Sequence, residues 1–179
     1  MRQEIVLGNS IAIRPAGPAD ASKLAALGAA TFVETFGHLY KDEDLAAFLK
    51  ESHSAEAYEE LLADDAWRIW IAETAEGQAV GFAVAGPCSL PVPDRPENSG
   101  ELSRLYILKS HQGGGLGTRM IEPILKYLRA RFENIYLSVY SENYGAQKLY
   151  QRYGFEKIAD YFFMVGDHAD PEWIMQLKR

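Results

Sequence analysis

The chain has a single cysteine and no long apolar run. Cys88 alone excludes an internal disulfide and a cysteine-based metal site. No apolar stretch approaches the roughly 18 residues that a membrane-spanning helix needs, and residues 1–14 do not resemble a signal peptide. His53, His111 and His168 have no partners at metal-ligand spacing, so we expect no metal. A cytoplasmic protein that does not bind a membrane is therefore the expectation.

Positive charge is also scarce. The chain has 18 Lys and Arg against 25 Asp and Glu, a net charge of −7, which argues against a nucleic-acid surface. Residues 1–100 carry 16 acidic and 7 basic side chains, whereas residues 101–179 carry 9 and 11. This asymmetry fits a cationic substrate on one side and an anionic cofactor on the other, although surface charge varies along any chain.

The order of elements predicts a mixed α/β domain. A length of 179 residues with 47% hydrophobic residues suits one core. After a strand within residues 3–14, Pro18, Asp42 and Ser54 are typical of three helix starts. Residues 86–100, rich in proline and glycine, predict a loop. We expect strands at 67–73, 79–85, 101–108, 135–140, 156–165 and 172–178, with helices from 116 and at 143–153. The β-α-β-α order in the second half predicts two neighbouring parallel strands.

The most informative segment is the run from Gln112 to Gly117, Gln-Gly-Gly-Gly-Leu-Gly, between a predicted strand and a predicted helix. Glycines let backbone N–H groups converge, and the helix adds its free N–H groups and the positive end of its dipole, so the segment suits an anion such as phosphate. A nucleoside-triphosphate loop would need a lysine after Gly117, and none follows. A dinucleotide loop would need the pattern Gly-x-Gly-x-x-Gly. The sixth position is Thr118 when counted from Gly113 and Met120 when counted from Gly115, so neither frame fits.

The pattern that this segment does meet is Gln/Arg-x-x-Gly-x-Gly/Ala, through Gln112, Gly115 and Gly117. Here the chain resembles the GNAT superfamily, the Gcn5-related N-acetyltransferases, in which the loop binds the pyrophosphate of acetyl-CoA. Residues 101–108 look like that family's strand before the loop. Residues 143–155 look like its Asn-x-x-Ala-x-x-x-Tyr-x-x-x-Gly-Phe segment. The resemblance covers residues 67–178 well and the helical N-terminal region more loosely.

The resemblance implies a twisted, mostly antiparallel mixed sheet of about seven strands. Its central parallel pair would splay around the coenzyme, with helices on both faces. It implies a single domain over residues 1–179, with a helical substrate-side region at about 18–64 and an acetyl-CoA-binding core at about 101–155. A homodimer is compatible with this family. The implied coenzyme contacts are Leu105, Tyr106, Ile107, Gln112, Gly113, Gly114, Gly115, Leu116, Gly117, Thr118, Asn143 and Tyr150.

Two side chains are candidates for proton transfer. An alkylamine has a pKa near that of lysine, about 10.4, so it must lose a proton before it attacks a thioester. Glu101, placed 11 residues before Gln112, can accept that proton or orient the substrate. A strand-end glutamate bound to a neighbour is the alternative. Tyr150 matches the family position whose phenol protonates the coenzyme A thiolate, and helix packing is its alternative.

The acceptor is less clearly indicated. Residues 31–40 and 42–49, with the ending Val165-Gly-Asp…Trp-Ile-Met-x-Leu, look like bacterial spermidine/spermine acetyltransferases. Glu34, His38 and Tyr40 would then bind the amine, a small-molecule substrate. Two alternatives stay open: acetylation of protein or peptide amines, and an acyl-CoA-binding sensor without turnover. A sensor would lack the acid or the base, and both candidates are present.

Overall fold

The computed structural model describes residues 10–178, so residues 3–9 of the strand expected within residues 3–14 lie outside it. Within that range the chain forms one sheet in the order β1-β2-β3-β4-β5-β7-β6, in which β4 and β5 are parallel and the other neighbours antiparallel. The strands are β1 (Ala12–Pro15), β2 (Arg68–Glu73), β3 (Ala79–Pro87), β4 (Ser99–Ile107), β5 (Asn134–Tyr140), β6 (Phe155–Val165) and β7 (His168–Leu177). The α-helices are α1 (Ala21–Phe36), α2 (Asp42–Ser52), α3 (Ala55–Ala63), α4 (Leu116–Arg131) and α5 (Tyr144–Arg152). The predicted sheet and its parallel pair are confirmed.

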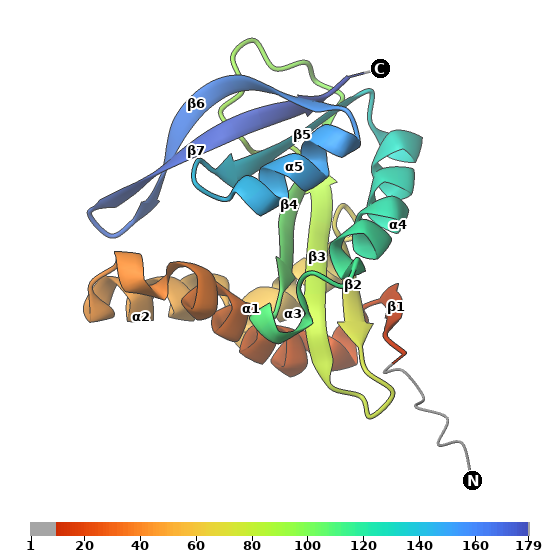
Figure 1. Cartoon of the computed structure of the whole chain (residues 1–179), viewed down its shortest axis with the longest axis vertical. Coiled ribbons are helices and arrows are strands. Elements are labelled where there is room, and N and C mark those ends of the chain that lie inside the picture. The colour runs from red at the N-terminus through yellow and green to blue at the C-terminus, as the bar shows by residue number, and fades with distance from the viewer. Residues whose placement is uncertain (1–9, 179) are drawn as a thin grey trace, which may run out of the picture.

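Helices cover both faces of the sheet because their apolar residues recur every three or four positions. On α4, Met120, Ile124 and Leu128 are fully buried against one face. Leu24 of α1 and Tyr58 of α3 are fully buried in the cluster on the other face. Figure 1 shows α1–α3 grouped together and α4 and α5 apart from them.

Two of the predicted helix starts behave differently. Ser54 caps α3 as expected, since its hydroxyl oxygen accepts a hydrogen bond from Ala57 N at 3.2 Å. Pro18 instead opens a 3-10 turn, and α1 begins three residues later. The Asp20 carboxylate folds back on this turn, accepting from Gly17 N at 2.8 Å and pairing with Arg14 at 2.8 Å. A tight turn before the helix lets one carboxylate serve both partners.

The parallel pair β4 and β5 is joined over only four residue pairs, from Ser99↔Asn134 to Leu102↔Leu137. A register shift on the β3 side of β4 leaves Ser103 without a partner in the register. Beyond Leu102 the two strands diverge, and β5 turns away toward β7 (Figure 1). The middle of the sheet is therefore open between residues 103–107 and 138–140.

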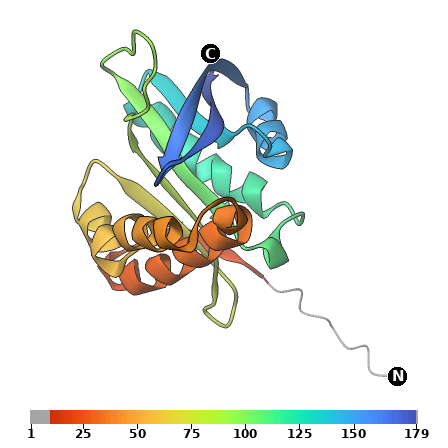
Figure 2. The same ribbon diagram turned by 90° about the vertical axis from the view of Figure 1, so that its left-hand side faces the viewer.

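The hairpin of β6 and β7 reaches from the end of the sheet to the helical layer. Its tip meets α2, and Figure 2 shows the hairpin descending onto the orange helices. A Cβ on Gly166, at the tip, would lie 2.2 Å from the Asp44 side chain, and its φ is +56°. Only glycine permits both the turn and this close approach. The contact fixes the hairpin against α2 and closes one wall of the site.

Candidate active site

The open middle of the sheet is one wall of a cavity of about 610 Å³. The separated parts of β4 and β5 line it, from 103 to 107 and from 138 to 140. Leu105 and Ile107 also pack on the α4 side, while Tyr106 packs against the clusters of α1 and α2. Burial raises the pKa of Tyr106 to about 12. The cavity thus passes between two strands and touches both helical layers.

The glycine loop borders one end of this cavity. Gln112 lines it, and its side-chain amide donates to the Ile107 carbonyl oxygen at 2.8 Å, which ties the loop to β4. Gly113 and Gly115 have φ of +81° and +83°, whereas Gly114 has no positive φ. A Cβ on any of these three glycines would meet nothing within 4 Å. Backbone conformation, not space, is what requires glycine at positions 113 and 115.

The first turn of α4 follows directly, and its N–H groups have no carbonyl partners within the helix. The Leu116 side chain is buried in the core, so only its main chain can face a ligand. A Cβ on Gly117 would lie 3.2 Å from Leu149 of α5, which makes this position a close helix contact. The Thr118 carbonyl accepts from the Tyr153 hydroxyl at 3.3 Å. Loop and helix together present converging N–H groups that fit a pyrophosphate.

Helix α5 brings two of the predicted residues to the cavity. Asn143 caps the helix, since its Oδ1 accepts from Ala146 N at 3.2 Å, and it lines the cavity as well. Tyr150 lines the cavity from the far end of α5, is 6% exposed and packs edge-on against Phe155 at 6.0 Å. Burial, with Tyr106 and Glu172 nearby, raises the pKa of Tyr150 above its usual value. Its phenol is protonated at neutral pH.

Glu101 lies where β4 and β5 are still paired, at the vertex of the opening, and lines the cavity. It is 3% exposed, and its carboxylate accepts from Ser89 N at 3.1 Å and Ser89 Oγ at 3.0 Å. Burial raises the pKa of Glu101, against the lowering effect of these hydrogen bonds. Ser89 belongs to the proline-rich loop, which therefore forms a wall of the site. A buried carboxylate with a raised pKa suits proton acceptance near neutral pH.

The three predicted acceptor residues are placed differently from one another. His38 and Tyr40 line the cavity, after the end of α1. Glu34 is exposed and is not part of the lining; its Oε2 accepts from Lys109 N at 3.0 Å. Glu34 thus joins α1 to the start of the glycine loop. The amphipathic pattern of α1 places Glu34 near this region but does not show which partner it binds.

Two acidic residues of β7 complete the acceptor side and were not foreseen. Asp170 and Glu172 are two positions apart on one strand and both line the cavity. The Tyr161 hydroxyl donates to Glu172 Oε2 at 2.8 Å, and burial raises the pKa of Glu172. The Tyr40 hydroxyl donates to Asp170 Oδ2. A signal was present in the sequence: two acids two positions apart share one face of an extended segment that continues into Trp173-Ile174-Met175.

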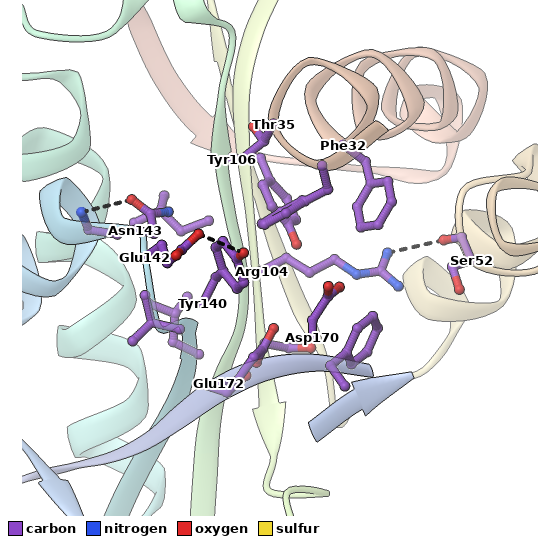
Figure 3. Close-up of a pocket in the computed structure, with 18 of the residues that line it drawn as sticks. Phe32, Thr35, Ser52, Arg104, Tyr106, Tyr140, Glu142, Asn143, Asp170 and Glu172 are labelled. Atoms are coloured by element: carbon purple, nitrogen blue, oxygen red, sulfur yellow. Dashed lines mark hydrogen bonds between the residues drawn. The ribbon is translucent and has the colours of Figure 1, made fainter. Parts of the chain in front are cut away.

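The cavity is more acidic than basic. Its lining contains four carboxylates, Glu101, Glu142, Asp170 and Glu172, against the side chains of Arg104 and Lys109. His53 also lines it, and burial together with the Arg104 charge lowers the pKa of His53 to about 3, so this ring is neutral. Arg104 donates to Ser52 O at 3.3 Å and to the Tyr58 hydroxyl at 3.1 Å, as Figure 3 shows for Ser52.

Residues 10–178 contain no group of three or more His, Cys, Asp or Glu side chains placed to hold a metal ion. Over the same residues, no helix is long and apolar enough to cross a membrane.

Comparison with known sequences shows the family of the chain. The sequence model of the acetyltransferase (GNAT) family matches residues 33–155, and the chain belongs to that family. A spermine/spermidine N(1)-acetyltransferase of Bacillus subtilis (strain 168) is 38% identical over 85 residues, which cover 45% of this chain and 55% of that protein. A probable spermine N(1)-acetyltransferase of Bacillus subtilis subsp. natto is 39% identical over 85 residues, which likewise cover 45% of this chain and 55% of that protein. The chain thus aligns with about half the length of these curated relatives.

The fold is also that of a known complex with the coenzyme. A PaiA N-acetyltransferase from Thermoplasma acidophilum, solved with coenzyme A, superposes with a TM-score of 0.75 and 20% identity. The superposition covers 95% of this chain and 99% of that one. A spermidine/spermine N-acetyltransferase from Vibrio cholerae superposes with a TM-score of 0.62 and 21% identity, over 93% and 91% of the two chains. These likenesses establish the sheet with its open parallel pair.

Proposed function

We propose that this protein is an acetyl-CoA-dependent N-acetyltransferase that transfers acetyl directly to a primary amine in a ternary complex. The observation that carries the proposal is the cavity between β4 and β5. It joins the glycine loop at one end to Glu101 and Tyr150 within the same space. Residues 1–179 then form one acetyltransferase domain, in which residues 101–155 hold the coenzyme and residues 18–64 cover the acceptor.

The loop and the open strand fit acetyl-CoA. Converging N–H groups of residues 113–118 suit its pyrophosphate, and the left-handed backbone at Gly113 and Gly115 makes that convergence possible. Residues 105–107 pair with β3 on one side and have no β5 partner on the other, so the N–H and carbonyl groups that face the opening suit strand-like pairing with the pantetheine arm. Of these groups, the Ile107 carbonyl already accepts from Gln112. One N–H of this strand would polarise the acetyl oxygen. The coenzyme supplies the activated acetyl group when it is bound.

Proton movement falls to two residues on opposite sides of the opening. The ionised Glu101 carboxylate, held by Ser89, accepts the proton of the acceptor ammonium, directly or through water. The neutral amine then attacks the acetyl carbon. The Tyr150 phenol donates its proton to the departing thiolate, and its raised pKa keeps that proton in place until then. Asn143 supports this end of the cavity as the cap of α5.

For the acceptor we propose a polyamine such as spermidine or spermine. Four carboxylates line the cavity, and the rings of Phe32, Tyr40 and Phe48 offer faces to a cation. The named activities of the Bacillus subtilis relatives point to the same chemistry. His38 and Tyr40 belong to this acceptor wall, while Glu34 would act only through the loop that it holds.

A second acceptor class is supported by Arg104. Its guanidinium lines the cavity and forms no salt bridge with any residue from 10 to 178. A cation in that position suits an acceptor that carries its own carboxylate, such as a peptide or an amino acid. The sensor alternative is disfavoured, because both proton-transfer residues line the cavity.

The test is coenzyme A release from acetyl-CoA over a panel of polyamines, amino acids, aminoglycosides and peptides. Turnover with spermidine or spermine is the expected result, and turnover only with peptides or amino acids would transfer the assignment to the second class. Acetyl-CoA should raise the melting temperature whereas NAD and ATP should not. Stabilisation by acetyl-CoA without turnover of any amine would instead support the sensor.

A further inference from the structure

Asp170 is the least satisfied polar side chain of the cavity. It is 2% exposed, and its Oδ2 accepts the hydrogen bond from Tyr40. Its Oδ1 is buried and accepts no hydrogen bond within the part of the chain that the structure describes. A buried carboxylate oxygen without a donor is unfavourable, because it has lost the hydrogen bonds that water would supply. The position therefore lacks a hydrogen-bond donor, and the cavity is where one can enter.

The surroundings of this oxygen favour a positively charged donor. The His168 ring nitrogen Nε2 lies 3.1 Å from Oδ1 at the exposed side of the hairpin, close enough for an ion pair only when the ring is protonated. Phe163 is the cross-strand neighbour of Asp170 and lines the cavity, and Tyr40 stacks on Phe32 at 5.8 Å. Carboxylate and aromatic faces together are the usual surroundings of a bound ammonium group.

A second carboxylate stands at a defined spacing. Glu172 is two positions further along β7, so the Cα atoms of Asp170 and Glu172 are about 7 Å apart and their side chains lie on the same face of the strand. Glu172 pairs with Tyr140, the last residue of β5, beside the opening between β4 and β5. Figure 3 shows Asp170 and Glu172 extending from β7 into the same space, with the Arg104 side chain drawn toward Ser52. The two acids thus lead from the hairpin to the reacting centre.

We propose that Asp170, held by Tyr40, binds a second ammonium group of the acceptor, while the amine to be acetylated lies beyond Glu172 at the opening. The acceptor class is then an aliphatic diamine or longer polyamine that is held at its distal end. This inference rests on the proposed function and deepens it, because it distinguishes diamines from monoamines of equal length. The alternative based on Arg104, an acceptor that carries its own carboxylate, predicts no such preference.

The experiment compares kcat/KM for putrescine with that for butylamine, which has the same carbon chain and one ammonium group. The wild type should prefer the diamine. Asp170→Asn keeps the size of the side chain and removes its charge, and it should lower the putrescine-to-butylamine ratio by roughly 10–100-fold. Tyr40→Phe should lower the ratio less, because the carboxylate stays but loses its donor. Asp167→Asn removes a charge from the exposed turn of the same hairpin and is the matched control.

A second measurement separates this inference from the proposed function. Spermidine binding to the coenzyme A complex is followed by calorimetry in the wild type, Asp170→Asn and Asp167→Asn, whether or not turnover occurs. Loss of binding in Asp170→Asn alone supports the subsite, even if no amine is acetylated. Equal ratios and equal affinities in wild type and Asp170→Asn overturn it, even if the wild type acetylates spermidine. An equal loss with putrescine and butylamine also overturns it, since it would indicate a structural role.

Discussion

The two sides of the cavity are built on different principles. The proposed donor side would use main-chain groups of contiguous segments, the glycine loop and the starts of α4 and α5. The acceptor side uses side chains from elements distant in sequence: Tyr40 after α1, Glu101 on β4, and Asp170 and Glu172 on β7. Backbone recognition constrains glycine positions and spacing, whereas side-chain recognition needs only that the right group reaches the cavity. On this proposal the donor side is limited by backbone geometry and the acceptor side by which side chains reach the cavity.

The sharpest test of this division is Tyr150→Phe. The phenol proton is lost while the ring stays packed against Phe155, so kcat should fall roughly 10²-fold or more. The affinity for acetyl-CoA should change little. Steady-state kinetics with a binding measurement for acetyl-CoA separate the two effects. An unchanged kcat would remove Tyr150 from proton transfer and leave it a packing residue.

Glu101→Gln should have the next largest effect, a loss in kcat/KM of about 10²-fold. The base must be ionised to act, so wild-type activity should fall as pH drops through its raised pKa. Gln cannot titrate, and the acidic limb of the pH profile should disappear in the variant while Ser89 keeps a partner. If the variant is slow but keeps the same acidic limb, another carboxylate is the base.

A smaller effect is expected on the donor side from Gly115→Ala. A Cβ at φ +83° is unfavourable by about 1–2 kcal/mol, which corresponds to roughly 5–30-fold in acetyl-CoA affinity if the loop must keep its shape. Gly114→Ala is the control, because position 114 has no positive φ and equally open space around it. Equal affinities of the two variants would argue that the loop conformation does not matter for binding.

The smallest effect tests the link between the two sides. Glu34→Ala removes the acceptor for the Lys109 N–H, an exposed hydrogen bond worth about 0.5–1.5 kcal/mol. We expect the KM for acetyl-CoA to rise by up to about 10-fold, because the glycine loop loses this hydrogen bond. The KM for the acceptor should change little. The opposite pattern, an acceptor KM that rises alone, would return Glu34 to the amine-binding residues.

The sequence predicted the parts of the molecule that depend on local rules. The Ser54 cap, the apolar stripe of α4 and the parallel pair followed from periodicity and element order. The 3-10 turn at Pro18 did not, because it depends on the side-chain pairing of Asp20 with Arg14, which periodicity does not reveal.

The acceptor side depends on tertiary contacts and was predicted less well. Glu34 faces the Lys109 N–H, and Tyr40 contacts a carboxylate 130 residues away, neither of which periodicity reveals. Glu172 stands on the strand expected at 172–178, whereas Asp170 precedes it, because β7 begins four residues earlier, at His168. The burial of both residues depends on the hairpin lying against α2. Strand alternation predicts which residues share a face and leaves open what covers that face.

The β6–β7 hairpin has a further consequence for how such a protein can change. Its register runs unbroken from Ala159↔Ile174 to Val165↔His168 and is set by its own turn. Among the strands within residues 10–178, it joins the rest of the sheet only through β5. Mutations near its tip can therefore alter the acids presented to the acceptor without disturbing the strands that hold the coenzyme. Descendants of one ancestral enzyme could acquire new amine preferences in this way while inheriting the donor chemistry intact.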